Sequence, residues 1–284
     1  MGAVSCCGLL TRRRVPAPSD PFDFSDPFDF SGPFDPSHAP HALFDVEQFR
    51  SLPRRHAVAR HVAEPTVVLG STQRPEVVDA VRATEEGVAV VRRRGGGGAV
   101  FLRPDDHLWV EAWIPRDDPL WEADVAVAAE WVGAWWSDAL GTSGAVDLVV
   151  HRGRAVPGPH GALVCFSGRG PGEVFRAERK VMGISQWRSR EGSLFHTCAY
   201  AHWDPYPLID LLDVDPPTRE ALRRDLPLVA AGLLDTDTAP DFDADSAPGA
   251  APAPTPDPPS LPLLRQTLLT TFATWEKDGS SHPA

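Results

Sequence analysis

Short apolar runs that end at glycine, proline or polar turns recur along the central part of the chain. Runs of about four to eight such residues are typical of buried strands. We expect strands at residues 65–70, 88–92, 99–102, 108–114, 147–151, 162–166, 173–176, 180–186 and 194–201. Tight turns join several of these ranges, so the pattern predicts a mixed, largely antiparallel sheet.

Apolar residues recur with helical spacing at three places. Residues 74–84 have this spacing, and residues 121–140 form a long run rich in alanine and tryptophan. A short amphipathic helix is expected over residues 263–272, and its spacing leaves open whether it docks on the domain. The expected fold class is therefore α/β of the α+β kind, with helices flanking the sheet.

Proline divides the chain into segments. The 284 residues include 30 prolines, which cluster at the two ends. Residues 20–37 contain three similar Pro- and Phe-rich units, and residues 236–260 are rich in Pro and Asp without Lys or Arg. Such compositions bury too little apolar surface to offset the entropy of ordering. We expect a disordered low-complexity segment at 1–40, a folded domain at 41–235, a Pro/Asp-rich linker at 236–260, and a short helix with a tail at 261–284.

Charge and cysteine content exclude several classes of function. The net charge of −12 argues against a general nucleic-acid or anionic-membrane binder, because neutralising phosphate needs clustered Lys and Arg. No apolar run reaches the roughly 18 residues of a membrane span, and the N-terminus lacks the basic-then-apolar order of a secretory signal. The cysteines, at positions 6, 7, 165 and 198, have no zinc spacing. These features favour a cytoplasmic protein without a metal site.

Lysine is rare in this chain. Of the 27 Lys and Arg residues, Lys180 and Lys277 are the lysines. Lysine carries a compact, rotatable point charge, whereas arginine is a planar fork, so a lysine in an arginine-rich chain indicates a place where arginine does not substitute. Lys277 lies in a polar tail, which leaves Lys180 as the candidate.

A glycine run follows three arginines at residues 92–98. Glycines let backbone N–H groups approach an anion or an acyl carboxyl closely, and the arginines supply countercharge. The run lacks the Gly-Lys-Ser/Thr ending of a Walker loop. A flexible basic hairpin turn is the alternative interpretation of the same residues.

Three segments together resemble a known superfamily. They read Val-Leu-Gly-Ser-Thr-Gln at 68–73, Arg-Arg-x-x-Gly-Gly-Gly-Ala-Val at 92–100 and Arg-Lys-Val-x-Gly-x-x-Gln at 179–186. In this order they resemble the lipoate-protein ligase and octanoyltransferase superfamily, which shares its catalytic fold with biotin-protein ligases. The resemblance covers about residues 60–200, and it implies that the domain at 41–235 is a catalytic domain of the biotin/lipoate ligase type.

The resemblance implies roles for individual residues. Arg93 matches the arginine that contacts the acyl-adenylate phosphate, and Lys180 matches the lysine that contacts the activated acyl carbonyl. The residues that it implies in substrate or nucleotide binding are Gly70, Gln73, Arg93, Gly96, Gly97, Gly98, Ala99, Val100, Phe101 and Gly183. For Lys180, a solvated strand end is the alternative.

Cys165 bears on the mechanism. Octanoyltransferases of this superfamily form an acyl-thioester on a cysteine, and one branch has the Cys-Phe…Glu…Arg-Lys pattern that residues 165–180 resemble. ATP-dependent ligases typically lack this thiol. Arg169 or Lys180 is the expected cation beside it, since a nearby cation favours the thiolate. A small buried core residue is the alternative for Cys165, as it is for Cys198.

Some residues depart from the pattern of the superfamily. Leu102-Arg103 stands where many members have His-Asp, residues 167–171 lack the Asn-Asp of the ligases, and His196-Thr197 replaces His-Gly. These changes leave the substrate and the type of activation open.

The resemblance implies an enzyme of protein lipoylation. It would join a lipoyl, octanoyl or related acyl group to a lysine of a lipoyl-carrier domain or a glycine cleavage H-type protein. An acyl carrier protein would be the donor for a transferase, whereas a ligase would use lipoate or octanoate with ATP and Mg²⁺; no tightly bound cofactor is implied. The alternative is a non-catalytic member that binds an acyl group or a partner.

Overall fold

The computed structural model describes residues 46–235 and 260–276, all within one compact unit, His38–Ala284. The segment at 1–40 and residues 236–259 of the expected linker lie outside these ranges. In the part of the chain that is described, no helix is long and apolar enough to cross a membrane.

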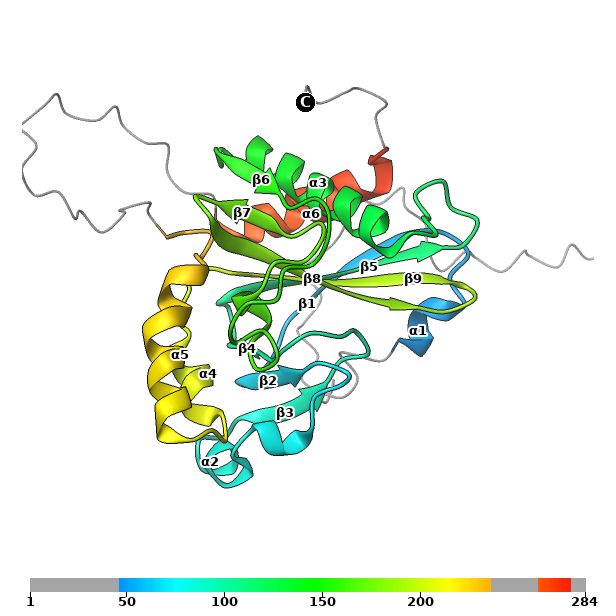
Figure 1. Ribbon diagram of the computed structural model, residues 1–284. Coiled ribbons are helices and arrows are strands. Elements are labelled where there is room, and N and C mark those ends of the chain that lie inside the picture. The colour runs from blue at the N-terminus through cyan, green and yellow to red at the C-terminus, as the bar shows by residue number, and fades with distance from the viewer. Residues whose placement is uncertain (1–45, 236–259, 277–284) are drawn as a thin grey trace, which may run out of the picture. The chain divides into compact units, whose positions relative to one another are not determined.

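A six-stranded sheet forms the centre of the unit (Figure 1). Every neighbouring pair in it is antiparallel. In spatial order the strands are β1 (His56–Arg60), β5 (His107–Pro115), β9 (Gly192–Tyr200), β8 (Arg179–Arg188), β7 (Val174–Arg176) and β6 (Leu148–Val150).

A second, three-stranded sheet lies on one side of the large sheet (Figure 1). Its central strand β2 (Thr66–Leu69) pairs in parallel with β3 (Ala89–Arg92) and antiparallel with β4 (Val100–Leu102). The prediction of a mixed, largely antiparallel arrangement flanked by helices is therefore confirmed.

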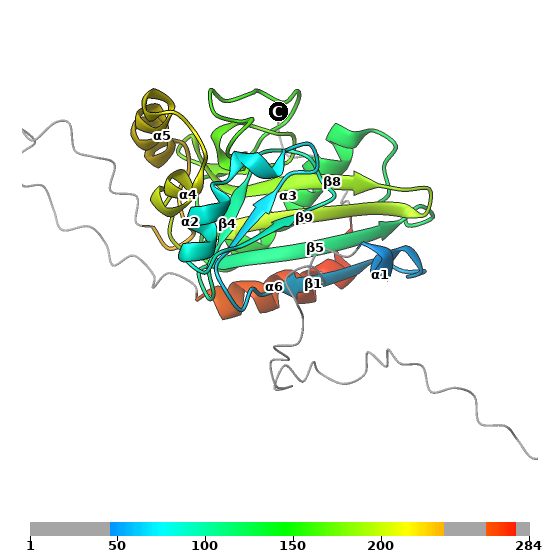
Figure 2. The same ribbon diagram turned by 90° about the horizontal axis from the view of Figure 1, so that it is seen from below.

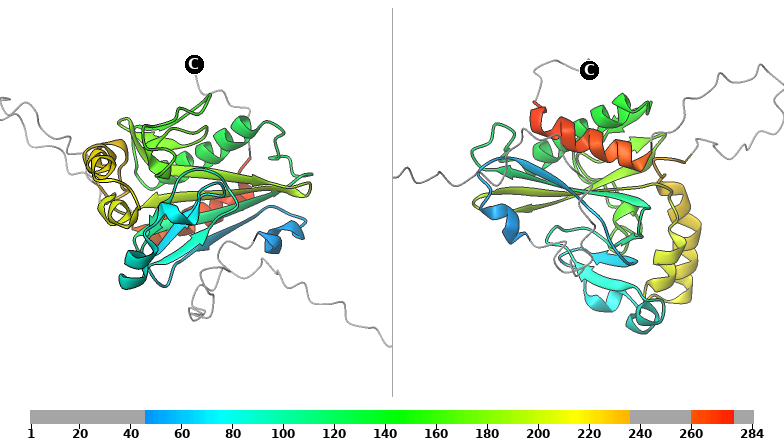
Figure 3. Two further views of the ribbon diagram at one scale, coloured as in Figure 1. Left: turned by 60° about the horizontal axis from the view of Figure 1, so that its bottom comes forward. Right: turned by 180° about the vertical axis from the view of Figure 1, so that it is seen from behind.

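Two helices cover the opposite face of the large sheet (Figure 3). Asp124 caps α3 (Val125–Thr142) by accepting hydrogen bonds from the backbone of Ala126 and Val127. The tryptophans of α3 pack into the main core. Helix α6 (Leu261–Thr274) lies beside α3 and along β1 (Figure 2), and it buries Leu264, Leu268 and Phe272 in the same core. The expected C-terminal helix thus docks on the sheet.

The outer face of the small sheet is covered by helices that are far apart in the sequence. A second core joins β2 and β4 to α4 (Tyr206–Leu211) and α5 (Pro216–Val229), and it includes Ala83 of α2 (Ala80–Glu85). A short helix α1 (Glu47–Arg50) begins the described part, and its Phe49 packs near Trp113. The small sheet is thus held between these helices and the large sheet.

Three local predictions were wrong. Residues 74–84 form a 3-10 turn η2 (Pro75–Val77) and then α2, because Val78 pairs with Leu212 and Asp79 caps a new helix. The helix expected from residue 121 begins at Val125, after its cap. Residues 162–166 make one bridge to the small sheet and continue into the 3-10 turn η3 (Cys165–Ser167) instead of forming a strand.

Candidate functional site

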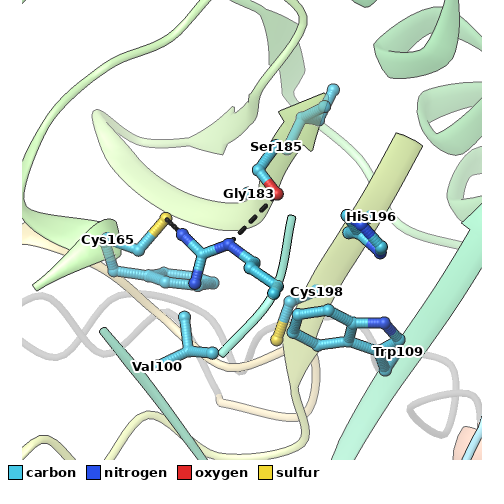
Figure 4. Close-up of a pocket in the computed structure, with 10 residues that line it drawn as sticks. Val100, Trp109, Cys165, Gly183, Ser185, His196 and Cys198 are labelled. Carbon is cyan, nitrogen blue, oxygen red and sulfur yellow. Dashed lines mark hydrogen bonds between the residues drawn. The ribbon is translucent and has the colours of Figure 1, made fainter. Parts of the chain in front are cut away.

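A small pocket lies between strands of the large sheet and residues at the edge of the small sheet (Figure 4). Strands β5, β8 and β9 form its floor, and β4 and η3 approach it from the side of the small sheet. Its lining residues are Arg93, Val100, Trp109, Cys165, Phe166, Gly183, Ile184, Ser185, His196 and Cys198.

Arg93 ties the glycine turn together. Its side chain is buried, and its guanidinium donates to the carbonyl oxygens of Gly96 at 2.6 Å and Gly98 at 2.9 Å. It also donates to the Ser185 hydroxyl of β8 at 3.2 Å. A buried guanidinium needs such acceptors, and here they fix the turn against the large sheet. Arg93 therefore fixes the conformation of the turn and also contributes a positive charge to the pocket.

Two glycines allow a close approach of backbone at this turn. Gly97 has φ +96°, and a Cβ there would lie 3.0 Å from Arg93 Nη2 and 3.4 Å from Cys165 Sγ. A Cβ on Gly70, at the end of β2, would lie 1.8 Å from the Gly97 carbonyl oxygen. At Gly97 the positive φ strains any other residue, and at Gly70 a Cβ would collide with the backbone.

Gln73 holds the backbone beside the glycine turn in place through hydrogen bonds. Its side-chain oxygen accepts from the Gly70 N–H at 3.0 Å, and its amide nitrogen donates to the carbonyl oxygens of Ala162 at 2.9 Å and Leu163 at 3.1 Å. It thus joins the end of β2 to the segment that precedes Cys165. In this structure Gln73 acts on the pocket through the backbone that it holds.

Cys165 is half-buried at the start of η3, and its thiol faces the pocket (Figure 4). Its N–H donates to the Ala99 carbonyl at 3.0 Å, which fixes its backbone against β4. The cation beside its Sγ is Arg93, with Nη2 at 3.9 Å. Arg169, an expected neighbour, instead pairs with Glu178 at 2.7 Å.

Lys180 is buried, with 1% of its side chain exposed, so it is not a solvated strand end. Its ammonium makes a 2.7 Å ion pair with Glu173 Oε2 and donates to the Cys165 carbonyl oxygen at 3.0 Å. It also lies 5.4 Å from the centre of the Phe166 ring. Lys180 therefore approaches Cys165 from the backbone side, while Arg93 approaches its sulfur.

Glu173 completes this arrangement. Its carboxylate also accepts hydrogen bonds from the backbone N–H groups of Gly170 at 2.6 Å and Ile184 at 3.4 Å. The side chain is 5% exposed. Its two oxygens thus connect the segment before β7 to Lys180 and Ile184 of β8.

A buried polar chain lies on the other side of the pocket. His196 Nδ1 lies 3.1 Å from Glu111 Oε1, and the other oxygen of Glu111 accepts from Arg60 at 2.8 Å. Sequence reasoning noted His196 as a departure from a motif and missed Glu111 and Arg60. Cys198 lines the same side, and burial raises the pKa of its thiol well above the ordinary value.

The sequence-predicted residues occupy three places. Arg93, Val100, Cys165 and Gly183 line the pocket, and Lys180 lies directly behind Cys165. Phe101 points away from the pocket into the core beneath α4 and α5. The remaining predicted residues support or form the backbone near the pocket; they are Gly70, Gln73, Gly96, Gly97, Gly98 and Ala99.

Metal ligands are a separate question from these contacts. Within residues 46–235 and 260–276, no three His, Cys, Asp or Glu side chains are grouped so that they could hold a metal ion.

Comparison with protein families identifies the class of the chain. The model of the lipoyl protein ligase A/B catalytic domain matches residues 46–223, which is more than half of the chain. The matched range contains the whole pocket together with Lys180 and Glu173. The chain belongs to this family.

Solved structures share the fold at low sequence identity. One is a bipartite lipoate protein ligase with its E2 lipoyl domain from Thermoplasma acidophilum, with 18% identity, TM-score 0.57, and coverage of 82% of this chain and 76% of that chain. A second is lipoate-protein ligase A bound with ATP, with 20% identity, TM-score 0.53, and coverage of 82% and 78%. A third is a Thermoplasma acidophilum protein with bound lipoic acid, with 19% identity, TM-score 0.52, and coverage of 82% and 78%. A search among curated proteins gave no match.

Proposed function

We propose that this chain transfers a lipoyl, octanoyl or related medium acyl group to the ε-amine of a lysine on a lipoyl-carrier domain, through a thioester on Cys165. The observation that carries the proposal is the position of the Cys165 sulfur. It faces the pocket, 3.9 Å from a buried arginine, while Lys180 holds the carbonyl of the same residue at 3.0 Å. A thiol next to fixed positive charge is suited to nucleophilic catalysis.

The first step is acyl transfer to the enzyme. The Cys165 thiol gives up its proton and attacks the thioester carbonyl of an acylated carrier protein. A new carbon–sulfur bond forms, the carrier's carbon–sulfur bond breaks, and the carrier thiolate leaves as the thiol after taking up that proton through solvent. Arg93 Nη2 lies beside the sulfur, so its charge can stabilise the oxyanion that develops next to it.

The second step forms the amide. The neutral amine of the acceptor lysine attacks the Cys165 thioester, the carbon–nitrogen bond forms, and the cysteine leaves as a thiolate while the amine loses a proton. Lys180 lies behind Cys165, and its contact with the Cys165 carbonyl positions the nucleophile. No oxidant or nucleotide is consumed.

The deciding experiment is mass spectrometry of the full chain mixed with octanoyl-acyl carrier protein without ATP. We expect one added octanoyl group that hydroxylamine removes, and no such adduct on Cys165→Ser. Cys198→Ser is the matched control, because Cys198 lines the same pocket but is buried with a raised pKa. An adduct that depends on Cys198 instead of Cys165 would contradict the assignment.

An ATP-dependent ligase is the second candidate. Its support is the exposed part of the glycine turn, where the space around Gly96 is open and Arg92 and Arg94 are exposed, so backbone N–H groups and arginines can meet a phosphate. ATP with Mg²⁺ would supply an acyl-adenylate when bound there. In that case lipoylation of the acceptor would require ATP and Cys165→Ser would keep nearly full rate. No product under either condition would favour a non-catalytic acyl- or partner-binding protein.

For the partners, we propose a lipoyl domain as acceptor, supported by the fold shared with a lipoate protein ligase that was described with its E2 lipoyl domain. A glycine cleavage H-type protein is the second acceptor to test, and acyl carrier protein is the donor. The place of action that we propose is the cytoplasm. Comparing the two purified acceptors in one assay would rank them.

A further inference from the structure

His196 is one of the few buried polar side chains that face the pocket. It lies on β9 opposite Glu111 of β5 and Ser185 of β8, and it is 2% exposed. Alternate residues of β9 face opposite sides of the sheet, so Phe195 packs into the main core while His196 lines the pocket. The strand therefore sets the side of the sheet on which the imidazole lies.

The buried chain behind His196 fixes which ring nitrogen faces the pocket. A carboxylate only accepts hydrogen bonds, so the His196 Nδ1 at 3.1 Å from Glu111 carries a proton. Arg60 balances the charge of Glu111 through the 2.8 Å contact, and a neutral imidazole leaves the buried network without net charge. In this form Nε2 is a hydrogen-bond acceptor.

His196 Nε2 is buried and has no hydrogen-bond partner among the residues that the structure describes. Buried polar atoms usually have one, and at a binding pocket the missing partner points to a ligand group. His107, on β5, also has a buried Nε2 without such a partner in the described ranges, but it does not line the pocket. Of these two histidines, His196 is the one whose Nε2 could bind a ligand, because it lines the pocket.

The position of His196 indicates which part of a ligand it meets. Figure 4 shows Cys165 on one side of the pocket and His196 with Trp109 on the other. An acyl group whose carbonyl carbon is bonded to Cys165 would therefore extend its chain toward His196. His196 Nε2 would therefore contact the acyl chain at a position remote from the carbonyl.

We propose that His196 Nε2 accepts a hydrogen bond from a hydroxyl or thiol group on the acyl chain, so that the enzyme prefers a medium acyl chain with such a donor over a plain saturated chain. This inference rests on the proposed function and adds the substrate class. Glu111 and Arg60 are positioning residues that act through His196. A saturated chain would cover Nε2 without pairing it, which is expected to disfavour that substrate about 10- to 100-fold.

A competition experiment tests the preference. The full chain is given equal amounts of octanoyl, 6-hydroxyoctanoyl and 8-hydroxyoctanoyl donors, as carrier thioesters without ATP or as free acids with ATP and Mg²⁺, and the products on a lipoyl domain are weighed. A separate arm uses 8-mercaptooctanoate to distinguish thiol from hydroxyl. We expect at least about tenfold more product from one of the hydroxyl- or thiol-bearing acyl chains than from the octanoyl chain.

Variants link the preference to His196. In His196→Phe the product ratio should fall to about one, in His196→Gln a part of it should remain because the amide oxygen accepts, and His107→Phe should leave it unchanged. Because the ratio is measured within one sample, it does not depend on how much of a variant folds. Equal incorporation by the unmodified protein would overturn the inference alone, whereas no product from any donor would overturn the proposed function as well.

Discussion

Glu173 and Lys180 form a buried ion pair, with 2.7 Å between Oε2 and Nζ and side chains that are 5% and 1% exposed. The pair bridges β8 and the residues that precede β7. Through the Cys165 carbonyl at 3.0 Å, the same ammonium reaches the thiol-bearing residue. The position of Cys165 therefore depends on a charge that has its own dedicated counterion.

Replacing Lys180 with arginine tests whether a compact ammonium is needed. Lys180→Arg keeps the charge, but the broader guanidinium has to fit a buried site bounded by Glu173 and the Phe166 ring. We expect at least about a 100-fold loss in acyl transfer, the scale of one misplaced oxyanion donor, with about 1–3 kcal/mol lost from overpacking. Initial rates and urea denaturation measure the two effects. A rate within a few-fold of the original would refute the role of Lys180.

Neutralising Glu173 tests the ion pair itself. Glu173→Gln leaves the ammonium of Lys180 buried without a counterion, so the free energy of unfolding should fall by about 3–5 kcal/mol. Replacing both residues, in Glu173→Gln with Lys180→Met, should recover much of this loss because no charge is then buried. Denaturation of the single and double variants completes the cycle, and additive losses would show that the two side chains are not coupled.

The sequence predicts most of the sheet because buried strands leave long apolar runs. The run at residues 108–114 and the segment at 194–201 appear in the structure as β5 and β9 with small changes at their ends. Strand β1 was missed, since His56–Arg60 is only half-buried and has a short alternating pattern. The assignment of β2, β3 and β4 to a separate sheet depends on long-range pairing, which a local pattern does not contain.

For the site as well, residues in local motifs could be predicted from the sequence, whereas contacts that depend on strand pairing could not. Arg93 and Cys165 line the pocket, and both were predicted as site residues because they lie in recognisable motifs. Glu111 and Arg60 were missed because their meeting with His196 depends on strand register across β1, β5 and β9. One signal was present in the sequence, since Glu111 interrupts an apolar strand with a charge, and a charge on a buried strand requires a partner.

The glycine turn gives a third prediction. Gly97→Val places a branched side chain at φ +96°, 3.0 Å from Arg93 Nη2, so it should abolish acyl binding and cost about 1–3 kcal/mol in stability. Gly96→Val is the matched control, because a Cβ at Gly96 meets no atom within 4 Å. Calorimetric titration with octanoate and lipoate compares the two. Unchanged affinity in Gly97→Val would make the turn a simple connector.

Acid pH should destabilise the fold through His107. Burial lowers the pKa of His107 from 6.5 to about 4, against the opposing effect of its hydrogen bond to the Arg103 carbonyl. The unfolded chain therefore binds a proton at a higher pH than the folded protein, and stability is lost as pH falls from about 6.5 toward 4, by up to about 3 kcal/mol. Urea denaturation at pH 7, 6 and 5 measures the slope. His107→Phe should lose this part of it, and an unchanged slope would assign the effect to other groups.

The last prediction concerns α6, which comes from the far end of the chain and completes the main core. Leu268 is fully buried there, whereas Leu263 on the same helix is 52% exposed. Leu268→Ala should lower the free energy of unfolding by about 2–5 kcal/mol because it leaves a cavity, and Leu263→Ala should change it by no more than about 0.5 kcal/mol. Removing residues 260–284 would expose the tryptophan-rich face of α3 and should make the remaining chain aggregate. Urea denaturation and light scattering measure these effects, and full stability and activity without residues 260–284 would show that the domain folds without α6.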